Sequence, residues 1–277
     1  MNKLMKISTV LTASIALFSG ITTVGQSATA HATKTKTYQV AVSSSSRPLS
    51  YEQNGQLKGY EVEALRKIDQ QLPDVKFKYH AVSQNAELVG LDSGKYDLAV
   101  NGFYKNPART KKYAFGKEND GLSLVRIYYN KQQFKNKVTK IDNLAGKELA
   151  PVNANGGMYN LLTTWNKQNG NKINVKTTTG IPTQQLLTGV NTGKYDAMID
   201  PSNLGEASII KERHLSQVQT SKPVRVYPTY ILFSKKNKPL ASKVDGALKA
   251  LKKDGTMKQL SQQAFGENVF KYQAKSN

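Results

Sequence analysis

The stretch LVGLDSGKYDLAV at residues 88–100 has a counterpart, LTGVNTGKYDAMI, at residues 187–199. Gly-Lys-Tyr-Asp is identical in the two copies, Gly90 corresponds to Gly189, and apolar runs follow both copies. Each copy predicts an amphipathic helix, a glycine that ends it in the left-handed conformation, and then a buried strand. A repeat after about one hundred residues indicates two related α/β lobes rather than a solenoid. Because open α/β sheets bind small molecules beyond the carboxyl ends of their strands, we expect a ligand site between the lobes.

The amino terminus has the pattern of a secretory signal peptide. Lys3 and Lys6 precede an uncharged stretch at residues 7–20, and Ala30-His31-Ala32 offers small residues at a cleavage site, so residues 1–32 are the predicted signal. The alternative is a membrane anchor, but the stretch is rich in Ser and Thr and falls short of about twenty apolar residues. The chain has no cysteine, which leaves no disulfide, thiol nucleophile or lipid-acceptor cysteine. We therefore expect a secreted protein, extracellular or periplasmic.

The chain is strongly basic. Removing residues 1–32, which carry two lysines and no acids, lowers the formal charge from +21 to +19. The lysines are scattered, which is typical of a dispersed, solvated surface. The alternative is attraction to anionic polymers of a cell wall or a host matrix. Nucleic acid is not an expected partner, since no basic patch with interleaved aromatics is present.

Hydrophobic periodicity gives a coarse order of elements. Val75, Phe77 and Tyr79 alternate with polar residues and predict a strand with one buried face, and Pro73 closes the helix before it. Asn106 and Pro107 predict the start of a short helix. The other expected elements are strands at 38–42, 98–100, 149–152, 173–175 and 230–233, crossings between lobes at 122–129 and 224–227, and helices starting at 60, around 161–165, at 240–253 and at 256–265.

Several short motifs occur in a characteristic order: RPLSY at 47–51, GYEVE at 59–63, LDSGKYD at 91–97, PAR at 107–109, KYAF at 112–115, LAGK at 144–147, KDGT at 253–256 and FG at 265–266. In this order they resemble the extracytoplasmic amino-acid-binding proteins of ABC importers. The resemblance implies an α/β, two-lobed periplasmic-binding-protein-like fold with a discontinuous first lobe and an inserted second lobe. The implied parts are lobe 1 at 37–121, lobe 2 at 122–223, the return of lobe 1 at 224–270 and a tail at 271–277.

An amino acid brings a carboxylate and an ammonium, and burying either without a partner costs several kcal/mol. A guanidinium offers a carboxylate two parallel donors and stays charged. Arg109, in the first turn of a helix beyond a lobe-one strand, is our candidate, and the family's carboxylate-binding arginine stands at this motif position. The alternative is a surface arginine paired with Glu118 or Asp120.

Other ligand-binding positions follow from the resemblance. Asn101, Gly102 and Tyr104 match the segment that contributes main-chain and hydroxyl groups to the ligand, although the family usually has a small hydroxyl residue where Tyr104 stands. Gly157 and Met158 belong to a segment, residues 155–158, that precedes a helix whose free amides can accept the carboxylate. The family's usual threonine is missing there.

The ammonium needs an acid. Asp200 is similar to the family's ammonium-binding aspartate, with the alternatives of a solvated turn acid or a helix cap. Asp97 and Asp196 begin strands in both repeat copies, and we expect them to satisfy backbone donors instead. Ser46 and Gln84 stand where the family commonly places aromatics against the ligand, so we expect either a more polar pocket or a ligand that is not a simple α-amino acid.

An enzyme is not expected. His80 and His214 have no acid or nucleophile partner in a motif, no metal-ligand spacing occurs, and no cofactor is implied. The leading hypothesis is a monomeric solute-binding protein that captures an amino acid and presents it to an ABC permease. The ending at 265–269 is reminiscent of the cystine-binding branch. The competing hypothesis is a cationic cell-surface adhesin built on the same fold.

Overall fold

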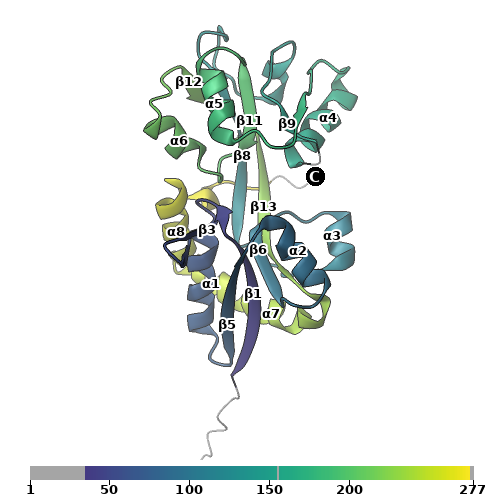
Figure 1. The fold of residues 1–277 in the computed structure, drawn as a ribbon, viewed down its shortest axis with the longest axis vertical. Coiled ribbons are helices and arrows are strands. Elements are labelled where there is room, and N and C mark those ends of the chain that lie inside the picture. Colours follow the sequence, from purple (N-terminus) through teal and green to yellow (C-terminus); the bar gives the residue numbers. More distant parts are fainter. Residues whose placement is uncertain (1–34, 155, 275–277) are drawn as a thin grey trace, which may run out of the picture. The chain divides into compact units, whose positions relative to one another are not determined.

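A mixed sheet of eight strands organises the molecule (Figure 1). The computed structural model describes residues 35–154 and 156–274, so the predicted signal peptide and residues 275–277 of the predicted tail lie outside the described residues. The strand order is β11-β8-β13-β6-β1-β5, with β12 paired to β8 and β7 paired to β13. The bounds are β1 Lys36–Ser43, β5 Val75–Val82, β6 Leu98–Phe103, β7 Ala114–Phe115, β8 Gly121–Asn130, β11 Ala197–Pro201, β12 Val218–Thr220 and β13 Arg225–Phe233.

The first lobe is built on β1, which pairs in parallel with β5 and β6. Successive side chains of a strand point to opposite faces, so Val40 and Val42 pack with one cluster while Ala41 packs with another. Four helices supply apolar residues to these clusters, which therefore cover both faces of the sheet as parallel strands require. They are α1 Tyr60–Gln71, α2 Gln84–Asp92, α7 Lys238–Lys253 and α8 Thr256–Phe265.

The second lobe is built on β8, β11 and β12, which are antiparallel. Ile127 packs in a cluster with α4, Gly157–Asn169, while its neighbour Tyr128 packs on the other face with α5, Thr183–Asn191. The lobe is completed by α6 Glu206–Glu212, β9 Val152–Asn153, β10 Thr177–Thr178 and the 3-10 helix η1 Ile141–Leu144.

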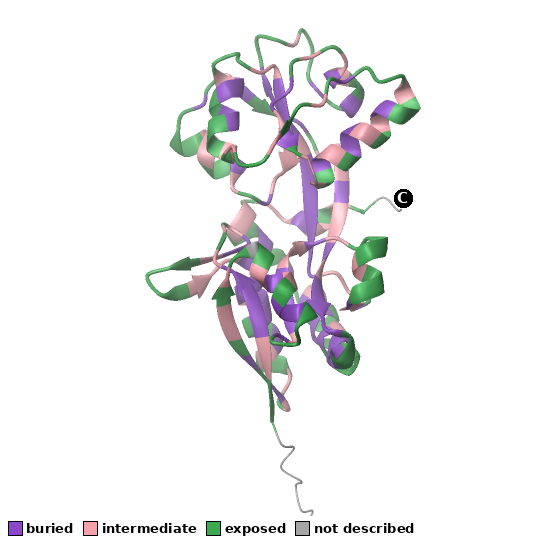
Figure 2. Cartoon of the chain, turned by 45° about the vertical axis from the view of Figure 1, so that its right-hand side comes forward, coloured by how far each residue is buried: buried purple, intermediate pink, exposed green. Residues whose placement is uncertain are grey.

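Two long strands connect the lobes. β8 pairs with β13 over residues 121–125 and with β11 over residues 125–129, so it belongs to both cores and is buried along nearly its whole length (Figure 2). The expected crossings at 122–129 and 224–227 are thus single uninterrupted strands. Since neither strand breaks between the cores, the lobe boundaries at 121/122 and 223/224 stay predictions.

The two copies of the repeat form the same hydrogen bonds at their aspartates. Asp97 donates its amide to the carbonyl of Gln39 and accepts the Gln39 amide on its carboxylate, and Asp196 does the same with Glu148. Both aspartates therefore satisfy backbone donors, as expected. The glycine that ends each helix has the predicted left-handed conformation, with φ of 76° at Gly94 and 80° in the second copy.

The smaller elements carry one wrong prediction. Residues 173–175 form no strand, because the side-chain amide of Asn166 donates to the carbonyl of Ile173 and accepts its amide, which takes the place of a strand partner. The expected strand at 149–152 is reduced to a bridge between Leu149 and Ala197 followed by β9. The remaining elements are β2 Ser45–Ser46, β3 Ser50–Gln53, β4 Gln56–Lys58, α3 Pro107–Lys112, and the 3-10 helices η2 Lys235–Asn237 and η3 Val269–Lys271.

Within residues 35–154 and 156–274, no helix has both the length and the apolar character that a membrane span would need.

Candidate functional site

A cavity of about 350 Å³ lies where the segment after β6 meets the second lobe. Tyr104 is its contribution from the first lobe, and Gly157, Met158, Asp200 and Leu204 are among its residues from the second. The first turn of α4 adjoins this cavity, so backbone amides that have no partner within the helix are close to it. Four of the predicted site residues are brought together here.

Tyr104 reaches across to the second lobe. Its hydroxyl hydrogen-bonds the Ser123 hydroxyl at 2.6 Å, and its ring lies 5.1 Å from the ring of Tyr227 between centroids. A methyl group placed on Gly157 would stand 3.6 Å from the Tyr104 ring. Burial raises the pKa of Tyr104 to about 12, so the phenol stays neutral. Where the family has a small hydroxyl residue, this chain has an aromatic wall that keeps a hydroxyl.

Asp200 faces the cavity from β11 with a second carboxyl beside it. Burial raises the pKa of Asp200 to about 7, and contact with Glu206 holds it below the value that burial alone would give. Burial first, and then the charge of Asp200, raise the pKa of Glu206 well above its usual value. Among the described residues, no lysine or arginine forms an ion pair with either carboxyl. The pair therefore has no cationic partner in the described part of the chain.

Arg109 lies beside this cavity's wall and is not among its lining residues. Asn106 caps α3 through the Arg109 amide, and the Arg109 guanidinium donates to the carbonyl of Tyr104 at 3.0 Å. The guanidinium also stands 5.1 Å from the centre of the Phe103 ring, and burial lowers its pKa. It forms no ion pair with any described carboxylate.

The two acids considered as surface partners of Arg109 are engaged elsewhere. Glu118 pairs with Lys252, and the buried Asp120 accepts from the Thr229 hydroxyl. Neither acid forms an ion pair with Arg109.

Asn101 and Gly102 are fixed from behind by two buried glutamates. The Asn101 side chain donates to Glu87 at 3.0 Å, and the Gly102 amide donates to Glu61 at 2.7 Å. Burial raises the pKa of Glu87 to about 8 and raises that of Glu61 well above its usual value. Gly102 has a φ of 58°, a conformation that a side chain would disfavour. The last residues of β6 are thus anchored by these hydrogen bonds, although neither Asn101 nor Gly102 lines the cavity.

Ser46 is not among the residues that line the cavity. The Ser46 hydroxyl hydrogen-bonds the Ser43 hydroxyl at 2.8 Å. Gln84 begins α2, and its side chain lies outside the described part of the structure.

Sequence reasoning missed several residues of the site. Glu61 stands within the GYEVE motif, which was an available signal, but Glu206, Ser123 and Tyr227 belong to no motif. These three become visible only when the fold brings them to Tyr104 and Asp200. No group of three or more acids or histidines within the described ranges could hold a metal ion.

Two helix-flanked cores on one sheet, with an acidic cavity walled by residues of both, define a periplasmic-binding-protein-like solute receptor. The sequence matches the bacterial extracellular solute-binding proteins, family 3, over residues 38–267, and the chain belongs to that family. The family description and the names of relatives are those of binding proteins rather than enzymes.

Known proteins resemble the chain over most of its length. It is 27% identical over 227 residues to the L-cystine-binding protein TcyK of Bacillus subtilis, covering 80% of each chain. The fold matches the probable amino-acid ABC transporter extracellular-binding protein ytmK of Bacillus subtilis, with a TM-score of 0.72, 24% identity and coverage of 84% of this chain and 99% of that one. A structure concerning glutathione import via GshT and the cystine ABC importer TcyBC of Streptococcus mutans has a TM-score of 0.70 at 25% identity, covering 85% and 97%.

Proposed function

We propose that this protein captures an amino acid between its lobes and delivers it to the permease of an ABC importer. The observation that carries the proposal is the Asp200–Glu206 pair: Asp200 lines the cavity, Glu206 lies against Asp200, and neither forms an ion pair with a lysine or arginine among the described residues. An ammonium group from a ligand would remove the cost of ionising Asp200 in a buried position. The names of relatives, which bind L-cystine or amino acids, support the same class of ligand.

The carboxylate of the ligand is assigned to the other side of the cavity. The amides at Gly157 and Met158 open a helix of thirteen residues, whose amino-terminal end favours an anion. Arg109 would complete the carboxylate site by approaching from the first lobe, since its guanidinium has no acidic partner among the described residues and contacts only the uncharged Tyr104 carbonyl and Phe103 ring. Asn101, Gly102, Ser46 and Gln84 would join when the lobes close about β8 and β13.

Calorimetry on the secreted chain tests this function. The titrants are the proteinogenic amino acids, L-cystine and short peptides, and we expect saturable binding of at least one free amino acid. Asp200→Asn keeps the shape of the side chain but removes the negative charge, and is expected to weaken binding at least a hundredfold, the order seen when one partner of a buried charge pair is removed. Wild-type protein that binds none of these compounds would exclude the proposal.

We further propose that the charge excess holds the secreted protein to anionic wall polymers. The observation in favour is the formal charge of +19 that remains without residues 1–32, with lysines dispersed over an exposed surface. Attraction between exposed charges is screened over about 8 Å at physiological salt, so retention on purified wall should fall steeply between 50 and 500 mM NaCl. Amino-acid affinity, which depends on a partly enclosed cavity, should change little over the same range. Retention that is indifferent to salt would refute the polymer interaction and leave ligand capture untouched.

A further inference from the structure

Arg126 is the cation nearest to the proposed ammonium site along the sheet. It stands directly opposite Asp200 in the antiparallel pairing of β8 and β11. Residues in this relation share a face, with Cβ atoms about 5 Å apart, so a side chain as long as arginine can reach its neighbour. Nevertheless Arg126 forms no ion pair with Asp200. The arrangement raises the question of what holds this arginine away.

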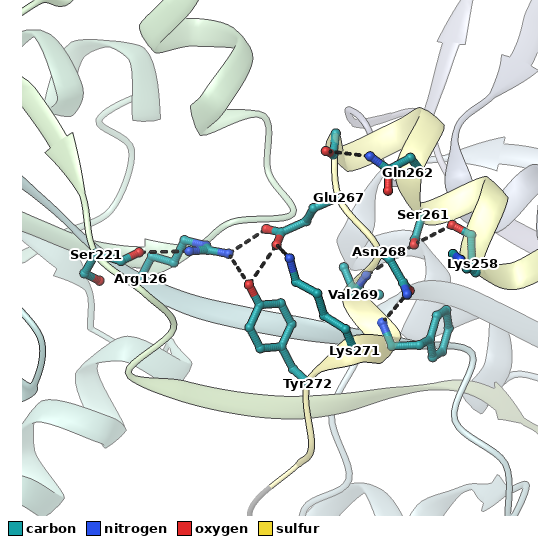
Figure 3. Close-up of polar contacts among 12 residues, drawn as sticks. Arg126, Ser221, Lys258, Ser261, Gln262, Glu267, Asn268, Val269, Lys271 and Tyr272 are labelled. Atoms are coloured by element: carbon teal, nitrogen blue, oxygen red, sulfur yellow. Dashed lines mark hydrogen bonds and ion pairs between the residues drawn. The ribbon is translucent and has the colours of Figure 1, made fainter.

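The segment after α8 supplies the answer (Figure 3). Arg126 Nη2 donates to Glu267 at 2.6 Å and to the Tyr272 hydroxyl at 3.4 Å, and Nη1 donates to the Ser221 carbonyl at 2.8 Å. The Tyr272 hydroxyl in turn donates to Glu267 at 3.0 Å, and Lys271 lies 3.5 Å from the same carboxylate. The guanidinium is thus occupied on both sides. Arg126 and Glu267 are only 12% and 23% exposed, so little water screens the pair.

The two charge groups influence a common neighbour. The buried Tyr128 phenol has its pKa raised first by burial, then by the charges of Glu206 and Asp200, against a lowering by Arg126. Tyr104 faces Asp200 from the first lobe and is also influenced by its charge. Both carboxyls near the cavity and the guanidinium therefore lie within electrostatic reach of one side chain.

We infer that Glu267 is a positioning residue that holds Arg126 away from Asp200 and so leaves the carboxyl pair free to receive the cationic group of a ligand. The inference rests on the proposed function for its ligand, but the arrangement itself is a property of the protein alone. Without Glu267 the guanidinium loses its acidic partner, and the nearest carboxyl on its own face of the sheet is Asp200. An Arg126–Asp200 pair would then compete with the ligand from within the chain.

The test measures the titration midpoint of the Asp200 carboxyl, and this measurement requires no ligand. Protein carrying ¹³C at the aspartate carboxyls is titrated by NMR, and the Asp200 signal is assigned by its absence in Asp200→Asn. In Glu267→Gln we expect the Asp200 midpoint to fall by about one to three pH units, the effect of an opposite charge at 4–6 Å. Adding Arg126→Met to Glu267→Gln should return the midpoint to the wild-type value, and Glu267→Asp should barely move it.

A second readout separates this inference from the function on which it rests. This readout uses whichever amino acid the wild type binds. Glu267→Gln should weaken its binding about tenfold, the effect expected if molecules with Asp200 unpaired fall to about a tenth of the population. The double variant should recover the wild-type affinity. Tyr272→Phe, which keeps the fold and removes only a hydroxyl, should shift both readouts in the same direction by less. An unchanged Asp200 midpoint in Glu267→Gln overturns the inference, as does a lowered midpoint that Arg126→Met fails to restore. Wild type without amino-acid binding would sink the proposed function, while the titration would still decide the role of Glu267.

Discussion

Ligand binding should release a proton and weaken in acid, because the carboxyl that we propose as the ammonium site ionises near neutrality. Asp200 has a pKa raised to about 7 by burial, and a ligand ammonium requires its ionised form. At pH 8 about ten molecules in eleven are ionised, and at pH 6 about one in eleven, so the dissociation constant should be roughly tenfold larger at pH 6. The carboxylate of an amino acid keeps its charge throughout this range and its ammonium is protonated at pH 6, so titration of the ligand does not account for weaker binding in acid.

The sign of the effect follows from the direction of the shift. A carboxyl whose pKa is raised holds its proton below about pH 7, and binding must first displace that proton. Affinity therefore rises as pH increases from 5 to 7 and levels off above pH 8. Calorimetry in two buffers of different ionisation enthalpy measures how many protons are released when the ligand binds. We expect close to one proton per ligand at pH 6 and about a tenth of that number at pH 8.

Asp200→Asn is the matched control, since an amide of the same size cannot titrate. It should lose the proton release together with most of the affinity. Equal dissociation constants at pH 6 and pH 8, with no proton released at pH 6, would refute the assignment of Asp200 to the ammonium.

Further predictions concern the repeat and the buried acids. Gly90→Ala and Gly189→Ala would place a methyl group 2.2 and 2.7 Å from tyrosine ring atoms, respectively. Each should therefore lower the free energy of unfolding, measured in urea, by about 1–3 kcal/mol. Gly246→Ala is the control, since its methyl group would meet nothing within 4 Å and should be neutral or stabilising. Equal effects at all three positions would contradict this packing. Glu87 has a pKa raised to about 8 in the folded protein. Its contribution to the free energy of unfolding is therefore lost as pH rises from about 4.3, the ordinary pKa of a glutamate, through 8. Glu87→Gln should be more stable than wild type by up to a few kcal/mol at pH 9, but not at pH 4. If the difference in stability between wild type and Glu87→Gln is the same at pH 4 and at pH 9, the raised pKa of Glu87 is wrong.

The repeat was predictable because contacts between residues close together in the sequence determine its structure. Gly90 must lack a side chain since the ring of Tyr96, six positions later, occupies that space, and Gly94 must adopt a left-handed conformation to connect helix and strand. Both requirements can be recognised in a single window of sequence. The predicted strand at 173–175 failed for the opposite reason, because the side chain of Asn166 offers Ile173 both hydrogen bonds that a neighbouring strand would have supplied. Periodicity alone does not reveal such a substitute.

The site was predictable only where the family order of motifs marks it. Tyr104 and Asp200 came from that order and meet at one cavity. Glu206 carries no signal, because its significance arises from its closeness to Asp200 after folding. The bond between Arg126 and Glu267 joins residues 141 positions apart, and neither residue's neighbours in sequence indicate the other.

A receptor for a zwitterion has to prevent its own cations from neutralising the acid meant for the ligand, and this requirement is severe here. The chain carries forty lysines and arginines against nineteen acids, so an acid with access to solvent readily finds a basic partner. Asp200 keeps its charge available in two ways: burial with Glu206 excludes the mobile surface lysines, and the one arginine aligned with it on the sheet is bound to Glu267. The carboxyl left unpaired in so basic a protein is thereby distinguished from the acids that serve only the fold, such as Asp97 and Asp196, whose oxygens are used by backbone amides.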